Sequence, residues 1–198
     1  MDKLVLASGN AGKLKELSSL LAPLGIEVLP QSAFNVSEAE EPHPSFVENA
    51  IAKARHAARA TGLPALADDS GLCVDVLGGA PGVLSARFAG EPKSDARNNA
   101  LLLERLAGEP NRHARFYCAL ALVRHADDPQ PIIACGEWRG EILETPRGQG
   151  GFGYDPLFLV PDLDQTAAEI DHSLKNVLSH RGKAMRQLLD RLRAEQQA

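Results

Sequence analysis

Four acidic residues in two segments are the first candidates for chemistry in this chain. Asp68 and Asp69 directly follow the apolar run Ala65 to Ala67, and Glu40 and Glu41 lie in an earlier irregular stretch. Mg²⁺ in proteins commonly takes one or two carboxylates together with substrate phosphates and water. The residue types therefore predict an oxygen-rich divalent-metal site. The alternative is that the glutamates are solvated loop charges and the aspartates cap the next turn.

A short glycine-containing turn near the N-terminus has the composition of a phosphate-binding loop. It follows the apolar run Leu4 to Ala7, and its residues are Ser8, Gly9, Asn10, Ala11, Gly12 and Lys13. Glycines let backbone N–H groups approach an anion, a following helix adds its positive N-terminal end, and lysine adds a mobile cation. The spacing is too short for a Walker loop. Simple strand-turn-helix packing is the alternative.

A second glycine-rich segment, from Gly148 to Pro156, surrounds two aromatic residues and an acid. The glycines leave Phe152 free to present its ring, and a purine base can stack on such a ring for about 1–3 kcal/mol. This pattern predicts a base platform. An ordinary hairpin loop with Phe152 turned into the core is the alternative.

A basic cluster precedes the C-terminal helix. Ser179 is suited to cap that helix, which places His180 and Arg181 in its first turn, where positive charge opposes the helix dipole. A ligand would explain this placement, since an arginine donates to the O6 and N7 acceptors of a 6-oxopurine. Lys175 lies one or two turns earlier. A solvated basic surface is the alternative.

Hydrophobic periodicity predicts the elements that hold these residues. Leucines at helical spacing, capping residues and terminal glycines predict helices from Leu14 to Leu24, from Ser45 to Gly62, from Ser94 to Leu106 and around Met185 to Leu192. Apolar or alternating runs predict strands over Leu4 to Ala7, Ile26 to Leu29, Ala65 to Ala67, Leu72 to Leu77, Ala114 to Val123, Ile132 to Cys135, Gly140 to Leu143 and Leu157 to Val160. An exposed turn is expected over Ala126 to Pro131. Early alternation of strands with helices, followed by a group of strands, favours an α/β or α+β fold around a mixed sheet.

Composition limits the class of partner. The 198 residues carry a formal net charge of −5, which argues against a general nucleic-acid binder but not against a small phosphorylated ligand. The three cysteines are far apart and odd in number, so neither a disulfide framework nor a thiolate metal site is expected. No signal segment or membrane-spanning run is recognised. We expect a cytoplasmic protein forming a single domain over residues 1–198, with no membrane or nucleic-acid partner.

Taken in order along the chain, these motifs resemble the inosine triphosphate pyrophosphatase family, and within it the bacterial members that act on dITP and XTP. The most specific are G-G-F-G-Y-D-P, which ends at Pro156, and S-H-R, which begins at Ser179. The resemblance implies an α/β fold with a long mixed central sheet, helices on its faces and two lobes flanking an active-site cleft. It also implies a homodimer, a Mg²⁺ requirement and hydrolysis of non-standard purine nucleoside triphosphates to the monophosphate and pyrophosphate.

The resemblance also implies a role for each matched residue. Asp69 would accept a proton, and Glu40 or Glu41 would join it at the metal. The residues implied to contact phosphate and sugar are Ser8, Gly9, Asn10, Ala11, Gly12, Lys13 and Ser70. Those implied to frame the base are Phe152, Gly153, Tyr154, Asp155, Lys175, His180 and Arg181.

Two other functions are weighed against this one. A Maf-type pyrophosphatase of pyrimidine or modified nucleotides shares the general plan, but its Ser-Pro-Arg-Arg segment is absent from the N-terminal turn. A nucleotide sensor that does not hydrolyse its ligand would not need Asp69 opposite the acidic loop that contains Glu40 and Glu41. The sequence leaves open whether inosine or xanthosine forms are preferred, how guanine is excluded, which glutamate is nearer the metal, how many metal ions bind and where the dimer surface lies.

Overall fold

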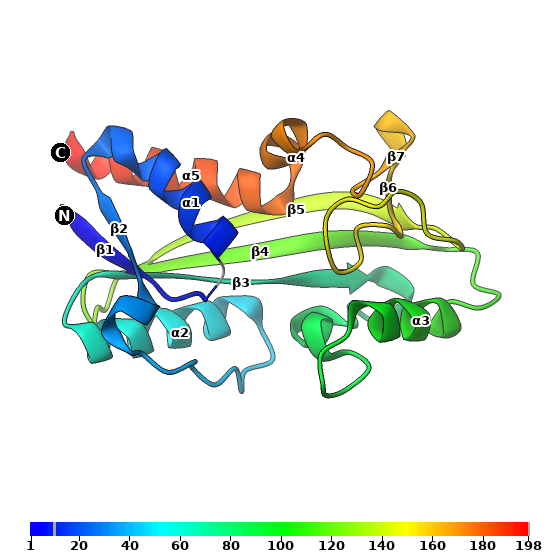
Figure 1. Ribbon diagram of the computed structural model, residues 1–198, viewed down its shortest axis with the longest axis horizontal. Helices are drawn as coiled ribbons and strands as arrows, with labels where there is room; N and C mark the ends of the chain where they lie inside the picture. Colours follow the sequence, from blue (N-terminus) through cyan, green and yellow to red (C-terminus); the bar gives the residue numbers. More distant parts are fainter. Residues whose placement is uncertain (10, 198) are drawn as a thin grey trace. The chain divides into compact units, whose positions relative to one another are not determined.

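The computed structural model describes residues 1–9 and 11–197 and has the alternating strand and helix order expected of an α/β protein (Figure 1). The strands are β1 (Lys3–Leu6), β2 (Glu27–Pro30), β3 (Ala65–Val74), β4 (His113–Val123), β5 (Ile132–Ile142), β6 (Phe158–Val160) and β7 (Gln165–Thr166). The α-helices are α1 (Ala11–Leu21), α2 (Phe46–Thr61), α3 (Asp95–Arg105), α4 (His172–Leu178) and α5 (His180–Gln196). Short 3₁₀ helices are η1 (Ala22–Leu24), η2 (Gln31–Phe34), η3 (Asp75–Leu77), η4 (Gly82–Arg87) and η5 (Pro161–Leu163).

In the described part of the chain, seven strands form one sheet in the order β2-β1-β3-β4-β5-β6-β7. β1 pairs in parallel with both β2 and β3, whereas β6 pairs antiparallel with both β5 and β7. The sheet is therefore mixed, as the resemblance implied. No helix among the described residues is long and apolar enough to cross a membrane.

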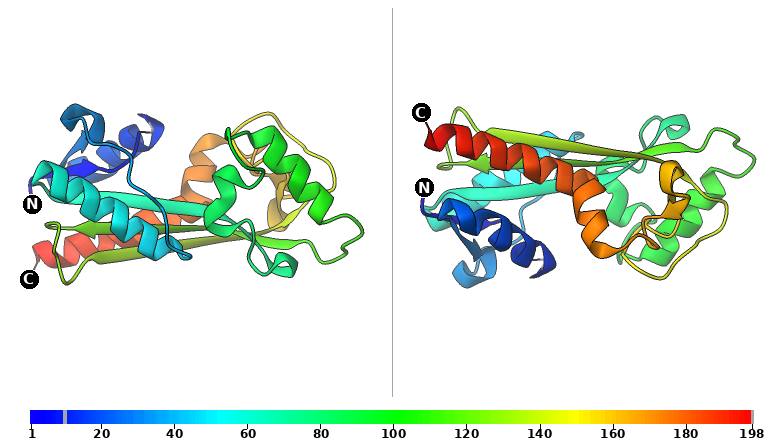
Figure 2. Two further views of the ribbon diagram at one scale, coloured as in Figure 1. Left: turned by 90° about the horizontal axis from the view of Figure 1, so that it is seen from below. Right: turned by 90° about the horizontal axis from the view of Figure 1, so that it is seen from above.

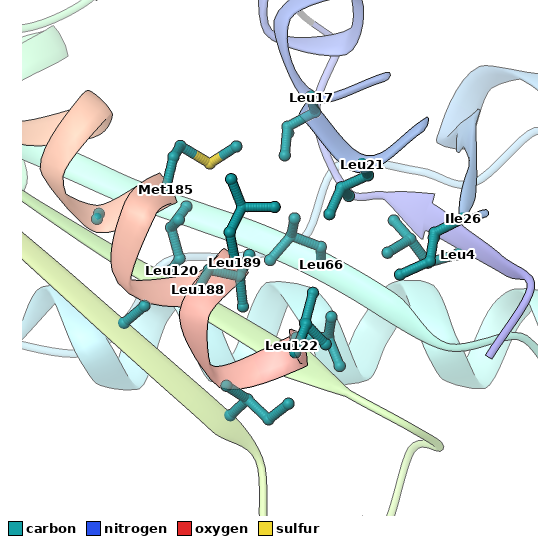
Figure 3. Packing of buried hydrophobic residues seen from close by; sticks show 14 of the residues in the cluster. Leu4, Leu17, Leu21, Ile26, Leu66, Leu120, Leu122, Met185, Leu188 and Leu189 are labelled. Carbon is teal, nitrogen blue, oxygen red and sulfur yellow. The ribbon is translucent and has the colours of Figure 1, made fainter. Parts of the chain in front are cut away.

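The chain divides into two compact units. Unit 1 contains residues 1–69, residues 118–135 and the chain from Ala184 onward, and unit 2 contains Ser70–Tyr117 and Gly136–Lys183. In unit 1, α1 and α5 cover one face of the strands and α2 covers the other (Figure 2). Leucines of α1 and α5 meet those of β1, β3 and β4 in a single apolar cluster (Figure 3). As predicted, α5 turns Met185, Leu188, Leu189 and Leu192 inward.

Local signals explain α2, which carries residues of the candidate site. The Ser45 side chain caps its N-terminus by accepting a hydrogen bond from the Glu48 N–H, and Gly62 ends it with φ of 70°. Alanines dominate its buried face, which lets the helix lie close to the sheet: Ala50, Ala54, Ala57 and Ala58. The predicted Ser45 cap and the terminal glycine are both confirmed.

Two predicted interruptions of strands are wrong. β3 does not end at Ala67 but continues through both aspartates to Val74, and β5 is continuous where two strands were expected. In β5 the burial alternates with period two through Glu137, Trp138 and Arg139, so the polar residues simply face outward. The sequence reading also missed α4 and β7, which are too short for a periodic signal.

The predicted exposed turn from Ala126 to Pro131 lies between β4 and β5 and is mostly exposed, but it also holds one buried carboxylate. Asp128 is 3% exposed and accepts hydrogen bonds from the backbone N–H groups of Arg124 at 2.9 Å and Gln130 at 2.8 Å. Burial raises the pKa of this carboxyl, but these N–H groups and the Arg124 guanidinium lower it more. The net pKa therefore lies below the ordinary value of 3.8.

Asp128→Asn is expected to lower the free energy of unfolding at pH 7 by about 1–3 kcal/mol, because an amide replaces a charged acceptor of several hydrogen bonds. Since folding lowers the pKa of Asp128, its stabilisation is full above the ordinary value of 3.8 and is lost as the pH falls through the lower folded value. Urea unfolding at several pH values measures this. Asp127→Asn, at a side chain that is 90% exposed, is the control and should change little.

Candidate functional site

The N-terminal turn has the predicted strand-turn-helix form. β1 ends at Leu6 and α1 begins at Ala11, with Gly12 and Lys13 in its first turn. Ser8 is half-buried and its N–H donates to the Leu6 carbonyl at 2.9 Å, whereas Gly9 is exposed. Asn10, predicted to contact phosphate, lies outside the described residues.

Lys13 is anchored to the strand that carries the aspartates. Its ammonium group donates to both carboxylate oxygens of Asp68, at 2.8 and 2.7 Å. The lysine side chain is 22% exposed and the aspartate 6%, so the pair lies at the edge of the interior. Asp68 therefore holds the cation of the N-terminal turn in place.

Asp69 points to a different group of partners, as alternation along a continuous strand requires. Its Oδ1 accepts a hydrogen bond from the Lys53 ammonium at 3.0 Å, and its Oδ2 accepts one from the Asn49 amide at 3.3 Å. Both partners come from α2 and are one helical turn apart. The two adjacent acids thus have separate roles: Asp68 binds α1 and Asp69 binds α2.

The surroundings of Asp69 favour a basic carboxylate. Burial raises the pKa of Asp69 above its ordinary value, and the nearby Lys53 ammonium offsets this only in part. Burial acts to lower the pKa of Lys53, but the charges of Asp69 and Glu41 raise it more, so the lysine stays protonated. A carboxylate with a raised pKa is better suited to accept a proton from water.

The structure distinguishes the two glutamates of the acidic loop. Glu41 Oε1 lies 2.7 Å from the Lys53 ammonium, which also contacts Asp69, whereas Glu40 is exposed. Two carboxylates from distant segments thus converge on one cation. Among the described residues there is no cluster of three or more His, Cys, Asp or Glu side chains that could hold a metal by itself.

The loop before α2 is also fixed to this group. The Asn49 side chain accepts a hydrogen bond from the His43 N–H at 3.0 Å and donates to the His43 carbonyl at 3.2 Å. It therefore links the backbone just after Glu41 to Asp69. Ser70, predicted to contact phosphate and sugar, is the next residue of β3 and is half-buried.

In unit 2, the glycine-rich segment presents Phe152 as the sequence predicted. This side chain is 65% exposed, so the alternative in which it enters the core is wrong. The buried Asp155 carboxylate lies beneath the turn and accepts a hydrogen bond from the Phe152 N–H at 2.8 Å. Gly151 has φ of 72°, and a Cβ there would lie 2.1 Å from the Asp155 carboxylate. The loop conformation therefore depends on both residues.

Lys175, on α4, completes this arrangement. Its ammonium group lies 2.5 Å from Asp155 Oδ2 and 5.6 Å from the centre of the Phe152 ring. One carboxylate thus fixes both the aromatic platform and a neighbouring cation. The contact with the ring face adds a cation–π interaction.

Tyr154 differs from the other residues predicted to frame the base. Its side chain is 4% exposed and its hydroxyl donates to the Ser85 carbonyl at 2.8 Å. Burial raises the pKa of this phenol, so it remains a neutral donor. The side chain therefore anchors the loop instead of facing a base. Gly153 is fixed as well, because its N–H donates to Asp95 at 2.7 Å and its carbonyl accepts from Asn99 at 3.0 Å.

The first turn of α5 contains His180 and Arg181, both half-buried. Ser179 caps the helix as predicted, its hydroxyl accepting a hydrogen bond from the Gly182 N–H at 3.2 Å. The His180 ring stacks on Phe116 of β4, with 5.0 Å between ring centres and 17° between ring planes. The imidazole orientation is therefore set by the core of unit 2.

The sequence reading missed the residues that support the predicted ones. Asn49 and Lys53 are polar positions four residues apart beside the alanine face of α2, and this interruption of an apolar stripe was an available signal. Asp95 and Asn99 show the same spacing on α3. Phe116 gave no such signal, because an aromatic residue in a strand is an ordinary core residue.

The comparisons with known proteins agree with the motifs. The profile of the Ham1 family matches residues 4–191. The chain is 74% identical over 190 residues to the dITP/XTP pyrophosphatase of Aromatoleum aromaticum, covering 96% of each chain, and 63% identical over 193 residues to that of Chromobacterium violaceum, covering 98% of each. The solved structure of a HAM1 protein from Coxiella burnetii superposes with a TM-score of 0.95 at 50% identity, covering 98% of this chain and 100% of that one.

Both the sequence match and the structural match extend over nearly the whole chain, and they include the aspartates of β3, the glycine-rich loop and the start of α5. The resemblance inferred from the motifs is thereby confirmed, and this chain belongs to the Ham1 family.

Proposed function

We propose that this protein hydrolyses non-standard purine nucleoside triphosphates, such as ITP, dITP and XTP, to the monophosphate and pyrophosphate. The observation that carries the proposal is the buried Asp69 carboxylate, with a raised pKa, beside Lys53 and Glu41. Relatives that are 74% and 63% identical bear the name dITP/XTP pyrophosphatase, which supports the same reaction.

In the proposed reaction, Asp69 accepts a proton from a water molecule as the water oxygen attacks the α-phosphorus. The bond from the α-phosphorus to the bridging oxygen breaks, and pyrophosphate leaves with that oxygen. Lys13 and the N–H groups at the start of α1 bind the triphosphate, and Lys53 adds positive charge close to Asp69. Ser8, Gly9, Ala11, Gly12 and Ser70 remain proposed contacts of the phosphates and sugar.

We propose Mg²⁺ as the cofactor, held by Asp69 and Glu41 together with phosphate oxygens. The donor set fits, because Asp69 Oδ1 and Glu41 Oε1 already lie 3.0 and 2.7 Å from a single cationic group, the Lys53 ammonium. When bound, the ion would supply neutralisation of the negative charge on the triphosphate. The chain itself contributes two oxygen ligands, one from the buried Asp69 and one from the half-buried Glu41, and leaves the remaining ligands to substrate and water.

Glu41→Gln is expected to raise the Mg²⁺ concentration needed for half-maximal activity by about 10- to 100-fold, because a neutral amide replaces one of two converging carboxylates. Glu40→Gln is the matched control and should leave that concentration within a factor of about three, as expected of an exposed charge. Mg²⁺ titration of pyrophosphate release measures both variants. Equal effects at the two positions would contradict the assignment of Glu41.

The base is proposed to bind in unit 2, stacked on Phe152, with Gly153, Asp155, Lys175, His180 and Arg181 around it. The exposed ring of Phe152 and the adjacent Lys175 ammonium support this. Donors at the O6 side would pair with a 6-oxopurine and meet the amino group of adenine unfavourably. Tyr154 acts in this proposal as the anchor of the loop.

Pyrophosphate release from ITP, dITP, XTP, GTP, ATP and the pyrimidine triphosphates, with and without Mg²⁺, tests the proposal. We expect efficient hydrolysis of the first three only. Preference for pyrimidine or modified nucleotides would instead indicate a Maf-type activity, and tight binding of ITP without hydrolysis would indicate a nucleotide sensor. Equal rates on GTP and ITP would contradict the proposed selectivity.

The resemblance also leads us to propose a homodimer in the cytoplasm, with residues 1–198 acting as one catalytic domain. Light scattering of the purified protein measures the oligomeric state. Cys73, Cys118 and Cys135 are odd in number and far apart in the sequence, which supports a reducing compartment.

A further inference from the structure

Gly182, in the first turn of α5, has no assigned role, and we infer that it is a positioning residue for base recognition. The inference rests on the proposed function, since it concerns Lys175, His180 and Arg181. Because Gly182 has no side chain, the first turn of α5 can lie directly against the end of α4. This contact fixes His180 and Arg181 relative to Lys175.

The space at Gly182 excludes any side chain. A Cβ built there would lie 1.9 Å from the carbonyl oxygen of Asn176 and 2.9 Å from its carbonyl carbon. Both atoms belong to the backbone of α4, so no rotation of a side chain can relieve the overlap. Even alanine would have to push the first turn of α5 away from α4.

Hydrogen bonds make the corner between the two helices rigid. The Ser179 N–H donates to the Lys175 carbonyl at 2.9 Å, and the Lys183 N–H donates to the Ser179 carbonyl at 3.0 Å. The buried Ser179 hydroxyl accepts from the Gly182 N–H. Only Ser179 separates the helices, and the chain changes direction sharply there (Figure 2). A shift of the first turn of α5 would therefore move His180 and Arg181 together.

The stack of His180 on Phe116 offers a way to observe this shift without any substrate. Phe116 also packs against Phe158, with 4.5 Å between ring centres, so its own position is fixed in the core. A ring 5.0 Å above another and nearly parallel to it experiences a ring-current shift in its NMR resonances. Displacement of α5 by even part of an ångström changes that shift.

Gly182→Ala is therefore expected to lower kcat/KM for ITP by roughly 10- to 100-fold, mainly through KM, because the base-binding groups are displaced from their geometry. The imidazole resonance of His180, assigned with a His180→Gln variant, should move toward the position of a free histidine. Asp69 is not altered, so kcat at saturating ITP should change much less. Ser179→Ala, which removes one hydrogen bond of the corner, should have a smaller effect in the same direction.

Gly108→Ala is the control, since this glycine lies in the same unit and a Cβ there has no other atom within 4 Å, although its φ of 74° makes any side chain unfavourable. It should lower the melting temperature without moving the His180 resonance or the KM. If Gly182→Ala leaves the resonance and KM unchanged, or affects them no more than Gly108→Ala, the inference is wrong. If Gly182→Ala does not fold, an unchanged resonance and KM in Ser179→Ala would overturn it. The His180 resonance is measured without nucleotide and therefore tests the role of Gly182 alone. If the unmodified protein does not hydrolyse ITP, the proposed function is refuted independently of that result.

Discussion

Asp69→Asn is expected to reduce the turnover of ITP by about 10²- to 10⁴-fold, the usual contribution of a general base. The amide has the shape of the carboxylate but cannot take the proton of the attacking water. Nucleotide binding should persist, because the Lys13 ammonium group is held by both carboxylate oxygens of the other aspartate, Asp68. Pyrophosphate release at saturating Mg²⁺ and calorimetric binding of ITP measure the two properties separately.

The pH dependence of the unmodified protein gives an independent check. A proton acceptor must be ionised, so kcat/KM should fall as the pH falls through the pKa of Asp69, which burial places above the ordinary 3.8. Asp68→Asn is the variant with which Asp69→Asn is compared, to test whether the loss of turnover is specific to Asp69. It alters the neighbouring carboxylate that holds Lys13, and it should affect KM more than kcat. Unchanged turnover in Asp69→Asn would refute the assignment of the base.

Phe152→Ala is expected to weaken binding of ITP by about 1–3 kcal/mol, which corresponds to roughly a 5- to 150-fold rise in the dissociation constant. The ring is 65% exposed, so its loss should cost little folding stability. The measurement is the KM for ITP, together with calorimetric binding of IMP. The loss of binding affinity should be similar for ITP and XTP, because stacking does not depend on the groups at the base edge.

Two further variants show whether loss of stacking is the cause of the weaker ITP binding. Phe152→Tyr keeps the aromatic face and should restore most of the affinity. Phe34→Ala removes another partly exposed phenylalanine, 39% exposed at the end of η2, and should leave the KM unchanged. If Phe152→Ala binds ITP as tightly as the unmodified protein, the base does not stack on this ring.

Signals that act within one element were predictable from the sequence. The capping pair Ser45 and Glu48 and the terminal Gly62 fixed the limits of α2, because each acts through backbone atoms a few positions away. The exposure of Phe152 followed from the surrounding glycines. Such signals need no knowledge of the rest of the fold.

Groups that depend on distant partners were not predictable in the same way. A run of Asp68, Asp69 and Ser70 favours the end of a strand by local propensity, yet β3 continues through it. Lys13 and Lys53 neutralise the two acids from positions 55 and 16 residues away. The sequence shows that the charges are present but not which of them meet.

The continuity of β3 through its two aspartates also restricts how this protein can change during evolution. Inserting or deleting a single residue ahead of Asp68 within the strand would turn each following side chain to the opposite face. Asp68 would then turn away from Lys13 and Asp69 away from Lys53, so neither acid would keep its present partner. We therefore expect this strand to keep a constant length among descendants of the chain, with length variation confined to the surrounding loops.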